Sequence, residues 1–479
     1  MARDNNSRFA IIATLLAFGL VGGISLLLWL LTGRVDRAVP LQANNSSSVA
    51  LNEDLPEAVR TRVSMGEEVL FPDASEAKRE GVEAIAQGDF ASAVTTFNAA
   101  LLDNPNDPES FIYRSNARIA NQKVLTIAVI APAGVSSDIG LEILRGVAQA
   151  QDDINRNGGV DGIPVMLVLV DDENDPELAQ TIAEGLVEDP AVMGVVGHYS
   201  SDVTLATAPI YESGELVTIT PVSTAVDLSG LSPYLYRTVP TDSFASAALS
   251  AYMLYYQEDK SVAVFFDSTS DLSASFKEEF NSFVVAWGGD VTAEYDLSDE
   301  QLDAETLLNG ELLTEAGDRV DSIMIAASPS TRLAAADVIN ANQNERTILG
   351  GDELYSREVL EETGRDAQAM VVAVPWHLLS RDTDEGFVEA SRDLWEGDVS
   401  WRTATAYDAV VAIAAGLEGD ASRGGLKSAL DDNNFSVESA TGPIVFLPSG
   451  DRRQVDRLVT VEPGTRSGTG YDFVPFVIE

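Results

Sequence analysis

The sequence predicts an α/β protein of two lobes, each a doubly wound parallel sheet, preceded by a transmembrane helix and a short all-α hairpin. From residue 123 onward, apolar β-branched runs alternate with amphipathic segments, and this alternation restarts near residue 261. An uncharged run at residues 9–31 predicts the membrane helix. A length of 479 residues with 45% hydrophobic side chains is enough for about three units, which agrees with this division.

Composition excludes several classes of protein. The chain has no Cys, which excludes a disulfide scaffold, a thiol nucleophile and a Cys-ligated metal site. His198 and His377 are its two histidines, too few for a multi-His metal site. With 30 basic and 76 acidic residues the net charge is −46, and no basic patch offsets it. We therefore expect no metal, no cofactor and no nucleic-acid partner.

The N-terminal part predicts a membrane anchor followed by a linker. After a short tail (1–8), residues 9–32 exceed the ~20 apolar residues that a spanning helix needs, and no convincing cleavage site follows. We expect the helix to remain uncleaved. Residues 33–73 are polar, low in complexity and interrupted by prolines, which is typical of a linker.

Residues 74–122 resemble one and a half tetratricopeptide repeats. Small residues such as Gly81 allow two antiparallel helices to approach, Phe90 and Phe97 fill the space between them, and Pro105 ends the second helix. Residues 108–120 predict a third helix with no partner of its own. The segment is interpreted as a spacer that docks on its neighbour or self-associates; a hairpin without repeat ancestry is the alternative.

The main domain predicts parallel strands whose carboxyl ends carry hydroxyl, amide and carboxylate groups. The chain has no phosphate-binding loop or dinucleotide fingerprint at these ends, so a small polar molecule is favoured over a nucleotide. Ligands of such sheets bind at the carboxyl ends of strands, which predicts a cleft between the lobes. The expected strands are 124–132, 165–172, 192–198 and 216–222, then 261–267, 322–328, 347–352 and 370–376; the expected helices of the first lobe are 140–157, 176–188 and 202–211.

Five stretches give a more specific indication, and they keep a fixed order and spacing. They are DDINRNGGVDGIPV (152–165), VDDENDPELA (170–179), VVGHYSSDVTLATAPIYE (195–212), ITPVSTAVDLS (219–229) and YLYRTVPTDS (234–243). Together they resemble type I periplasmic binding proteins of the leucine/isoleucine/valine-binding class, the substrate-binding components of ABC transporters, over about residues 123–479. The resemblance implies three crossovers, near Thr241, Pro375 and Pro443. Lobe one would comprise about 124–241 and 375–443, and lobe two about 242–374 and 444–479.

The resemblance also implies a ligand site in the cleft. Ser201 and Thr224 would supply hydroxyl groups to an amino-acid carboxylate, and Val222 and Ser223 backbone or hydroxyl contacts. Because Ser201 precedes a predicted helix, the N–H groups and dipole of that helix would favour an anion; the alternative is that Ser200 or Ser201 only caps it.

A second part of the implied site lies in lobe two. Asp352 would meet the ligand's ammonium group there, with Glu353 as its substitute, unless Asp352 only caps the helix that follows.

Some positions depart from the family pattern. Ile139 and Asp271 stand where the family often has aromatic residues, Asp202 adds negative charge, and Tyr199 is a candidate cleft wall. These changes leave a basic amino acid, a polyamine or a short amide open as the ligand.

Three further groups of residues have ordinary structural explanations. His198 is expected to be buried and bonded to backbone, and the acidic cluster is expected to be a solvated face with a helix cap at Asp175. The tryptophans could line the cleft, but most should pack in the core or on the surface. The cluster comprises Asp171, Asp172, Glu173 and Asp175, and the tryptophans are Trp287, Trp376, Trp395 and Trp401.

The sequence therefore predicts a membrane-anchored solute-binding protein with the bulk of its chain extracytoplasmic, in a periplasm or at a cell surface. It would capture an amino acid or a related amine or amide and deliver it to an ABC permease. A ligand-sensing subunit that acts through a partner protein is the alternative. We expect no enzyme, because the sequence shows no nucleophile elbow, triad or metal set.

Overall fold

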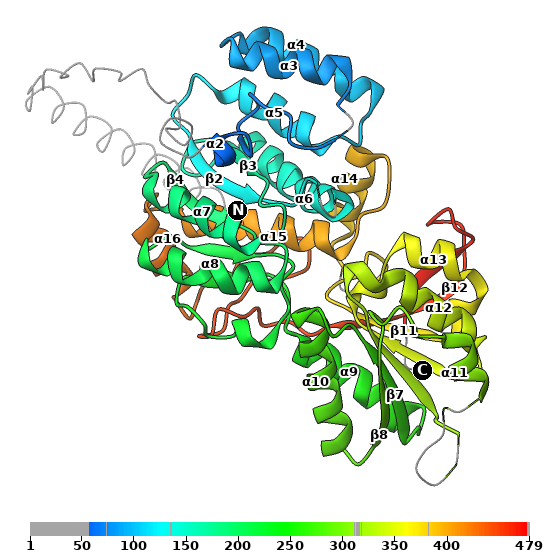
Figure 1. Cartoon of the computed structure of the whole chain (residues 1–479). Coiled ribbons are helices and arrows are strands. Elements are labelled where there is room, and N and C mark those ends of the chain that lie inside the picture. The colour runs from blue at the N-terminus through cyan, green and yellow to red at the C-terminus, as the bar shows by residue number, and fades with distance from the viewer. Residues whose placement is uncertain are drawn as a thin grey trace, which may run out of the picture. The chain divides into compact units, whose positions relative to one another are not determined.

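The computed structural model describes residues 57–72, 74–134, 137–310, 312, 317, 319–381 and 383–476. The predicted membrane helix at residues 9–32 lies outside these ranges. Within them, no helix combines the length and the hydrophobicity that crossing a bilayer requires. Two sheets organise the described chain, and each has helices on both of its faces (Figure 1).

The first lobe contains a six-stranded sheet of order β1-β3-β2-β4-β5-β6. β2 to β6 are parallel, whereas β1 pairs antiparallel with β3 through Val63 and Val170. The strands are β1 (Val63–Ser64), β2 (Leu125–Ile130), β3 (Val165–Val170), β4 (Val192–Val196), β5 (Thr218–Thr220) and β6 (Leu235–Arg237).

Alternate residues of these strands face two separate helix layers, which explains why the strands are apolar without interruption. Ile127 and Val129 pack toward α6 and α15, while Ala128 and Ile130 pack toward α7 and α8. The helices of this lobe are α6 (Ser137–Arg156), α7 (Pro176–Glu188), α8 (Ser201–Ser213), α14 (Glu385–Trp395), α15 (Trp401–Gly416) and α16 (Arg423–Leu430).

The second lobe contains a seven-stranded sheet of order β13-β12-β11-β10-β9-β7-β8. β7 to β11 are parallel, and β12 runs antiparallel to both β11 and β13. The strands are β7 (Ser261–Phe266), β8 (Asp290–Asp296), β9 (Ser322–Ala326), β10 (Thr347–Gly350), β11 (Met370–Val374), β12 (Arg457–Pro463) and β13 (Tyr471–Pro475). Helices α9 (Asp242–Ala251), α10 (Asp271–Ala286), α11 (Ala304–Gly310), α12 (Arg332–Asn342) and α13 (Arg357–Thr363) accompany them.

The structure corrects the prediction in two respects. Both sheets are mixed rather than purely parallel, and the sequence did not predict β1, β6, β8, β12 or β13. β8 and β13 are the edge strands of their sheet, and β12 lies next to β13. All three contain charged residues, so they lack the continuous apolar signal of a covered strand. The linker prediction is wrong for residues 57–72, where α2 (Glu57–Arg60) and β1 place Val59 and Val63 in the core of lobe one.

The helical segment before the lobes forms α3 (Glu76–Ala86), α4 (Phe90–Asp103) and α5 (Pro108–Ile119). A side chain at Gly81 would approach the Phe97 ring to 2.8 Å, so the small residue is required there. The partner of α5 is lobe one itself: Asn116 donates to the carbonyl of Leu167 in β3 at 2.7 Å. The spacer thus docks on its neighbour, while its tetratricopeptide likeness stays a prediction.

The chain passes between the lobes three times, and the last crossing falls later than predicted. Residues 444–452 still belong to lobe one, because Gly450 accepts a hydrogen bond from Arg237 at 3.0 Å and Phe446 packs on Tyr236. The crossing therefore lies between Arg452 and β12 rather than near Pro443.

Candidate functional site

A cavity of about 100 Å³ lies between the lobes, at the carboxyl ends of their strands. Lobe one contributes three loops and the start of α15, and lobe two contributes three loops. The lining residues are Asn174, Tyr199, Ser200, Ser201, Asp202, Val222, Thr224, Trp401 and Arg402 from lobe one, and Ser270, Leu272, Pro329, Asp352 and Glu353 from lobe two.

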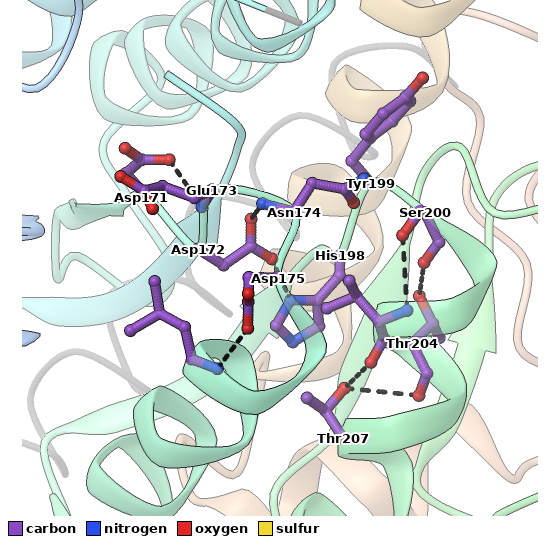
Figure 2. Close-up of polar contacts among 12 residues, drawn as sticks. Asp171, Asp172, Glu173, Asn174, Asp175, His198, Tyr199, Ser200, Thr204 and Thr207 are labelled. Atoms are coloured by element: carbon purple, nitrogen blue, oxygen red, sulfur yellow. Dashed lines mark hydrogen bonds and ion pairs between the residues drawn. The ribbon is translucent and has the colours of Figure 1, made fainter. Parts of the chain in front are cut away.

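A buried polar network fixes the lobe-one loops of this cavity (Figure 2). His198 Nδ1 lies 2.7 Å from Asp172 Oδ2, and His198 Nε2 lies 3.0 Å from the Tyr211 hydroxyl. Asp172 also accepts the backbone N–H of Asn174 at 3.0 Å. The carbonyl of His198 accepts from the Thr220 hydroxyl at 2.9 Å. The ends of β3, β4 and β5 are therefore joined through one residue, His198, which uses its ring toward Asp172 and its backbone carbonyl toward Thr220.

This network changes two predictions. His198 is buried as expected, but its ring bonds to side chains rather than to backbone. Asp171 and Asp172 are buried, so the acidic cluster is not a solvated face at those positions. Asp175 caps α7 as predicted, accepting from Glu177 and Leu178 at 2.9 Å. No group of acidic or His side chains in the described ranges is arranged to hold a metal ion.

We expect His198→Ala to weaken ligand affinity about 10-fold and to lower the melting temperature, because it leaves Asp172 Oδ2 and the Tyr211 hydroxyl without their partner in the core. His198→Gln should recover part of the affinity, since an amide can replace one hydrogen bond. Asp175→Ala is the control: loss of an exposed helix cap should cost about 1 kcal/mol of stability and leave affinity unchanged. Titration calorimetry and thermal melts measure both effects. Full affinity in His198→Ala would contradict the positioning role.

The start of α8 lines the cavity at the position where the sequence predicts an anion-binding wall. Ser200 is the N-cap, accepting from the Val203 N–H at 3.4 Å, so the capping interpretation holds for Ser200. Ser201 begins the helix and lines the cavity together with Thr224 and Val222. Ser223 does not line it: its hydroxyl group donates to the Tyr199 carbonyl at 3.1 Å, behind the wall.

The two lobe-two acids have different environments. Glu353 accepts from Arg332 at 2.6 Å and from Arg402 at 3.2 Å, and the pKa of Glu353 is lowered because the charges of these arginines outweigh burial. Asp352 has no ion-pair partner among the described residues. Burial and then the neighbouring charge of Glu353 raise the pKa of Asp352 to about 7. Asp352 therefore presents the available carboxylate, and it does not cap the turn it begins.

Two residues that depart from the family pattern, Ile139 and Asp271, do not line this cavity. Asp271 is exposed at the start of α10, and its neighbours Ser270 and Leu272 line the cavity in its place. Its charge still raises the pKa of Asp202, after the larger effect of burial. Ile139 is buried on α6 and lines an adjacent groove rather than this cavity.

The cavity is unusual in how many of its polar atoms lack partners. Buried polar atoms in proteins are nearly always hydrogen-bonded, so a cluster of exceptions indicates a missing partner. Trp401, one of the four tryptophans that the sequence offered as possible cleft residues, belongs to this cluster. Arg402 belongs to it as well and was not predicted; an arginine near the start of a largely apolar helix was the signal available. The unpaired atoms are Asn174 Oδ1, Tyr199 OH, Asp202 Oδ1, Trp401 Nε1 and Arg402 Nε.

Comparison with known proteins agrees with this architecture. The chain is 26% identical over 337 residues to the leucine-, isoleucine-, valine-, threonine- and alanine-binding protein of Pseudomonas aeruginosa, covering 69% of this chain and 88% of that one. It is 24% identical over 345 residues to the Leu/Ile/Val-binding protein of Escherichia coli, covering 70% and 90%.

Solved structures share the fold. A substrate-binding protein of an ABC transporter from Sphaerobacter thermophilus has a TM-score of 0.65 at 19% identity, with 75% of this chain and 97% of that one covered. The isoleucine complex of LivJ from Streptococcus pneumoniae has a TM-score of 0.62 at 22% identity, covering 74% and 100%. Residues 124–464 match the family model described as periplasmic binding protein. With the two-lobe fold and its cleft in place, this match shows that the chain belongs to the periplasmic binding protein family.

Proposed function

We propose that this protein is an extracytoplasmic solute-binding protein that captures an amino acid or a similar small polar solute between its lobes and delivers it to an ABC permease. The observation that carries the proposal is the inter-lobe cavity, which gathers unpaired donors and acceptors together with the unpaired carboxylate of Asp352. Two relatives are named for binding leucine, isoleucine and valine, and one of them also for threonine and alanine; these names support an amino acid as the ligand. Residues 9–32 would anchor the chain in a membrane.

The cavity residues suit the two charged ends of an amino acid. The α-carboxylate would bind at the start of α8, where Ser201, Thr224 and the helix N–H groups are grouped. The α-ammonium would bind Asp352 in a charge-assisted hydrogen bond. Because the two groups are held by different lobes, ligand binding would favour closure of the lobes about the crossovers.

The same geometry favours binding over catalysis. Both ring nitrogens of His198 are engaged by Asp172 and Tyr211, so this imidazole is not free to act as a base.

A second function is favoured by the helical segment α3 to α5, which docks on lobe one. Because α5 contacts β3 directly, this segment would transmit a change in lobe one to a partner protein bound to it. The protein would then be a sensing subunit.

We test the leading function with the full-length chain in mild detergent, titrated calorimetrically with the twenty amino acids, polyamines and short amides. Saturable one-to-one binding of an amino acid is the expected result. Ser201→Ala should weaken that binding about 10-fold, because it removes one hydrogen bond to a charged group. Ser213→Ala, at the exposed end of the same helix, is the matched control and should not change affinity. Equal affinities of the two variants would argue against the proposed carboxylate site.

Ligand-driven uptake into vesicles that contain the purified permease separates transport from sensing. Uptake that depends on this protein supports delivery. Binding without any uptake, combined with a ligand-dependent change in a partner bound to α3 and α4, would support the sensing function in its place.

A further inference from the structure

Three hydrogen-bond donors remain unpaired on the lobe-one wall of the cavity. Tyr199, Trp401 and Arg402 are 7%, 1% and 4% exposed, and Tyr199 OH, Trp401 Nε1 and Arg402 Nε have no partner. The Arg402 guanidinium lies 4.5 Å from the centre of the Trp401 ring, so stacking holds both side chains in place. All three residues line the same cavity.

The surrounding charges show that these donors face one region. Burial raises the pKa of the Tyr199 phenol, and the charges of Glu353 and Asp352 raise it further while those of Arg402 and Arg332 oppose them. The hydroxyl group therefore lies within the field of the Arg332–Glu353–Arg402 cluster. Both arginines of that cluster bind Glu353. Arg332 has two further acidic neighbours, Asp138 at 3.8 Å and Glu358 at 3.9 Å, whereas the Nε of Arg402 has no partner.

Neither end of an amino acid accounts for this region. The α-carboxylate is assigned to the start of α8 and the α-ammonium to Asp352. A branched-chain side chain would leave three buried donors without partners, which is unfavourable. A carboxylate accepts hydrogen bonds at both oxygens, and its charge strengthens the hydrogen bond from the Arg402 guanidinium.

We propose that the side-chain pocket formed by Tyr199, Trp401 and Arg402 accepts a second carboxylate, so that the ligand is an α-amino dicarboxylic acid. This inference rests on the proposed function. Arg402 Nε would donate to the distal carboxylate while its Nη2 continues to hold Glu353. Trp401 and Tyr199 would donate to the remaining lone pairs.

The approach to this pocket is compatible with an anionic ligand despite the net charge of −46. A groove of about 590 Å³ between the lobes adjoins the cavity, and Arg402 lines both. Five arginines balance five acidic residues in the groove, whereas in the whole chain acidic residues outnumber basic ones 76 to 30. The arginines are Arg145, Arg332, Arg357, Arg402 and Arg466, and the acids are Asp138, Glu142, Glu358, Asp398 and Asp472.

The test compares L-glutamate, L-aspartate, L-glutamine, L-leucine and L-lysine by titration calorimetry on the full-length chain. We expect one of the two dicarboxylic acids to bind at least 10-fold more tightly than leucine, glutamine and lysine. Tyr199→Phe removes one donor and keeps its ring, and Trp401→Phe removes one donor and keeps an aromatic group. Each should lower the affinity ratio of the preferred acid to leucine about 10-fold. Trp287→Phe, at an exposed tryptophan at the end of α10, is the matched control and should leave the ratio unchanged.

The outcomes separate this inference from the proposed function. Leucine or lysine binding more tightly than both acids would overturn the dicarboxylate pocket and leave the solute-binding function standing. Glutamine equal to glutamate would also overturn it, because the carboxylate charge would then contribute nothing. Absence of binding to every amino acid tested, in chain that melts cooperatively, would overturn both proposals. If the affinity ratio of the preferred acid to leucine is unchanged in both donor variants, the proposed pocket is overturned, because other residues then cause the preference.

Discussion

Asp352→Asn is expected to weaken amino-acid binding about 100-fold and, at the same time, to raise the melting temperature of the ligand-free protein at pH 8. The loss of affinity follows because an amide cannot supply the negative charge that a ligand ammonium needs, a difference of about 3 kcal/mol. The gain in stability follows because a carboxylate without an ion-pair partner is costly in this half-buried position beside Glu353. Few substitutions at a binding site produce these two effects together.

The pH dependence has a defined sign. Asp352 has a pKa of about 7 in the folded state, above its ordinary value of 3.8, so the folded state holds its proton more tightly than the unfolded state. This contribution to stability is complete at low pH and is lost as the pH rises through about 7. Burial raises the pKa of Asp242 to about 6, which acts in the same direction.

Thermal melts of the ligand-free chain between pH 5 and pH 8 should therefore show a decline with pH that is smaller in Asp352→Asn. Ligand affinity of the unmodified chain should weaken below pH 7, as Asp352 takes up a proton. Asp303→Asn is a matched control, since that exposed carboxylate has a lowered pKa from its hydrogen bonds to Thr306 and should not gain stability at pH 8. A variant at Asp352 that binds ligand normally would refute the role of this carboxylate.

Asp408→Ala is expected to lower the free energy of unfolding by about 3–5 kcal/mol, because it leaves a buried arginine charge without a partner. Asp408 and Arg452 are 0% and 1% exposed and form an ion pair. Arg452 also donates to the carbonyl oxygens of Thr238 at 3.2 Å and Gly442 at 3.1 Å. The ion pair therefore connects helix α15, which contains Asp408, to residues beside the first and third crossovers, Thr238 and Arg452.

Urea denaturation measures this cost. Arg392→Ala breaks the exposed pair with Asp398 and is the control, with an expected cost below about 1 kcal/mol. Replacing both members, as Asp408→Leu with Arg452→Met, should restore much of the stability, since the penalty comes from an unpaired charge rather than from the loss of a favourable pair. A cost below about 1 kcal/mol for Asp408→Ala would contradict this account.

The main strands and several site residues could be predicted because their signals are local. A parallel strand covered on both faces must be apolar throughout, and β2, β3, β7 and β9 meet this requirement in the sequence. Ser201, Thr224 and Asp352 follow such strands directly, and the carboxyl ends of parallel strands meet at one edge of the sheet. The fold and the position of the cleft were therefore determined by the sequence pattern itself.

The tertiary structure decided the rest, because it depends on contacts between distant segments. Trp401 and Arg402 join Tyr199 only because the chain returns to lobe one and packs α15 beside α6. Arg402 then binds Glu353, which leaves Asp352 as the available acid. Ser223 and Asp271 lie beside lining residues, but their side chains are directed elsewhere. The local sequence pattern determines which loops reach the cleft. The side chains that face the cleft are determined by packing between distant segments, such as those of Tyr199 and Trp401, which lie about 200 residues apart in the sequence.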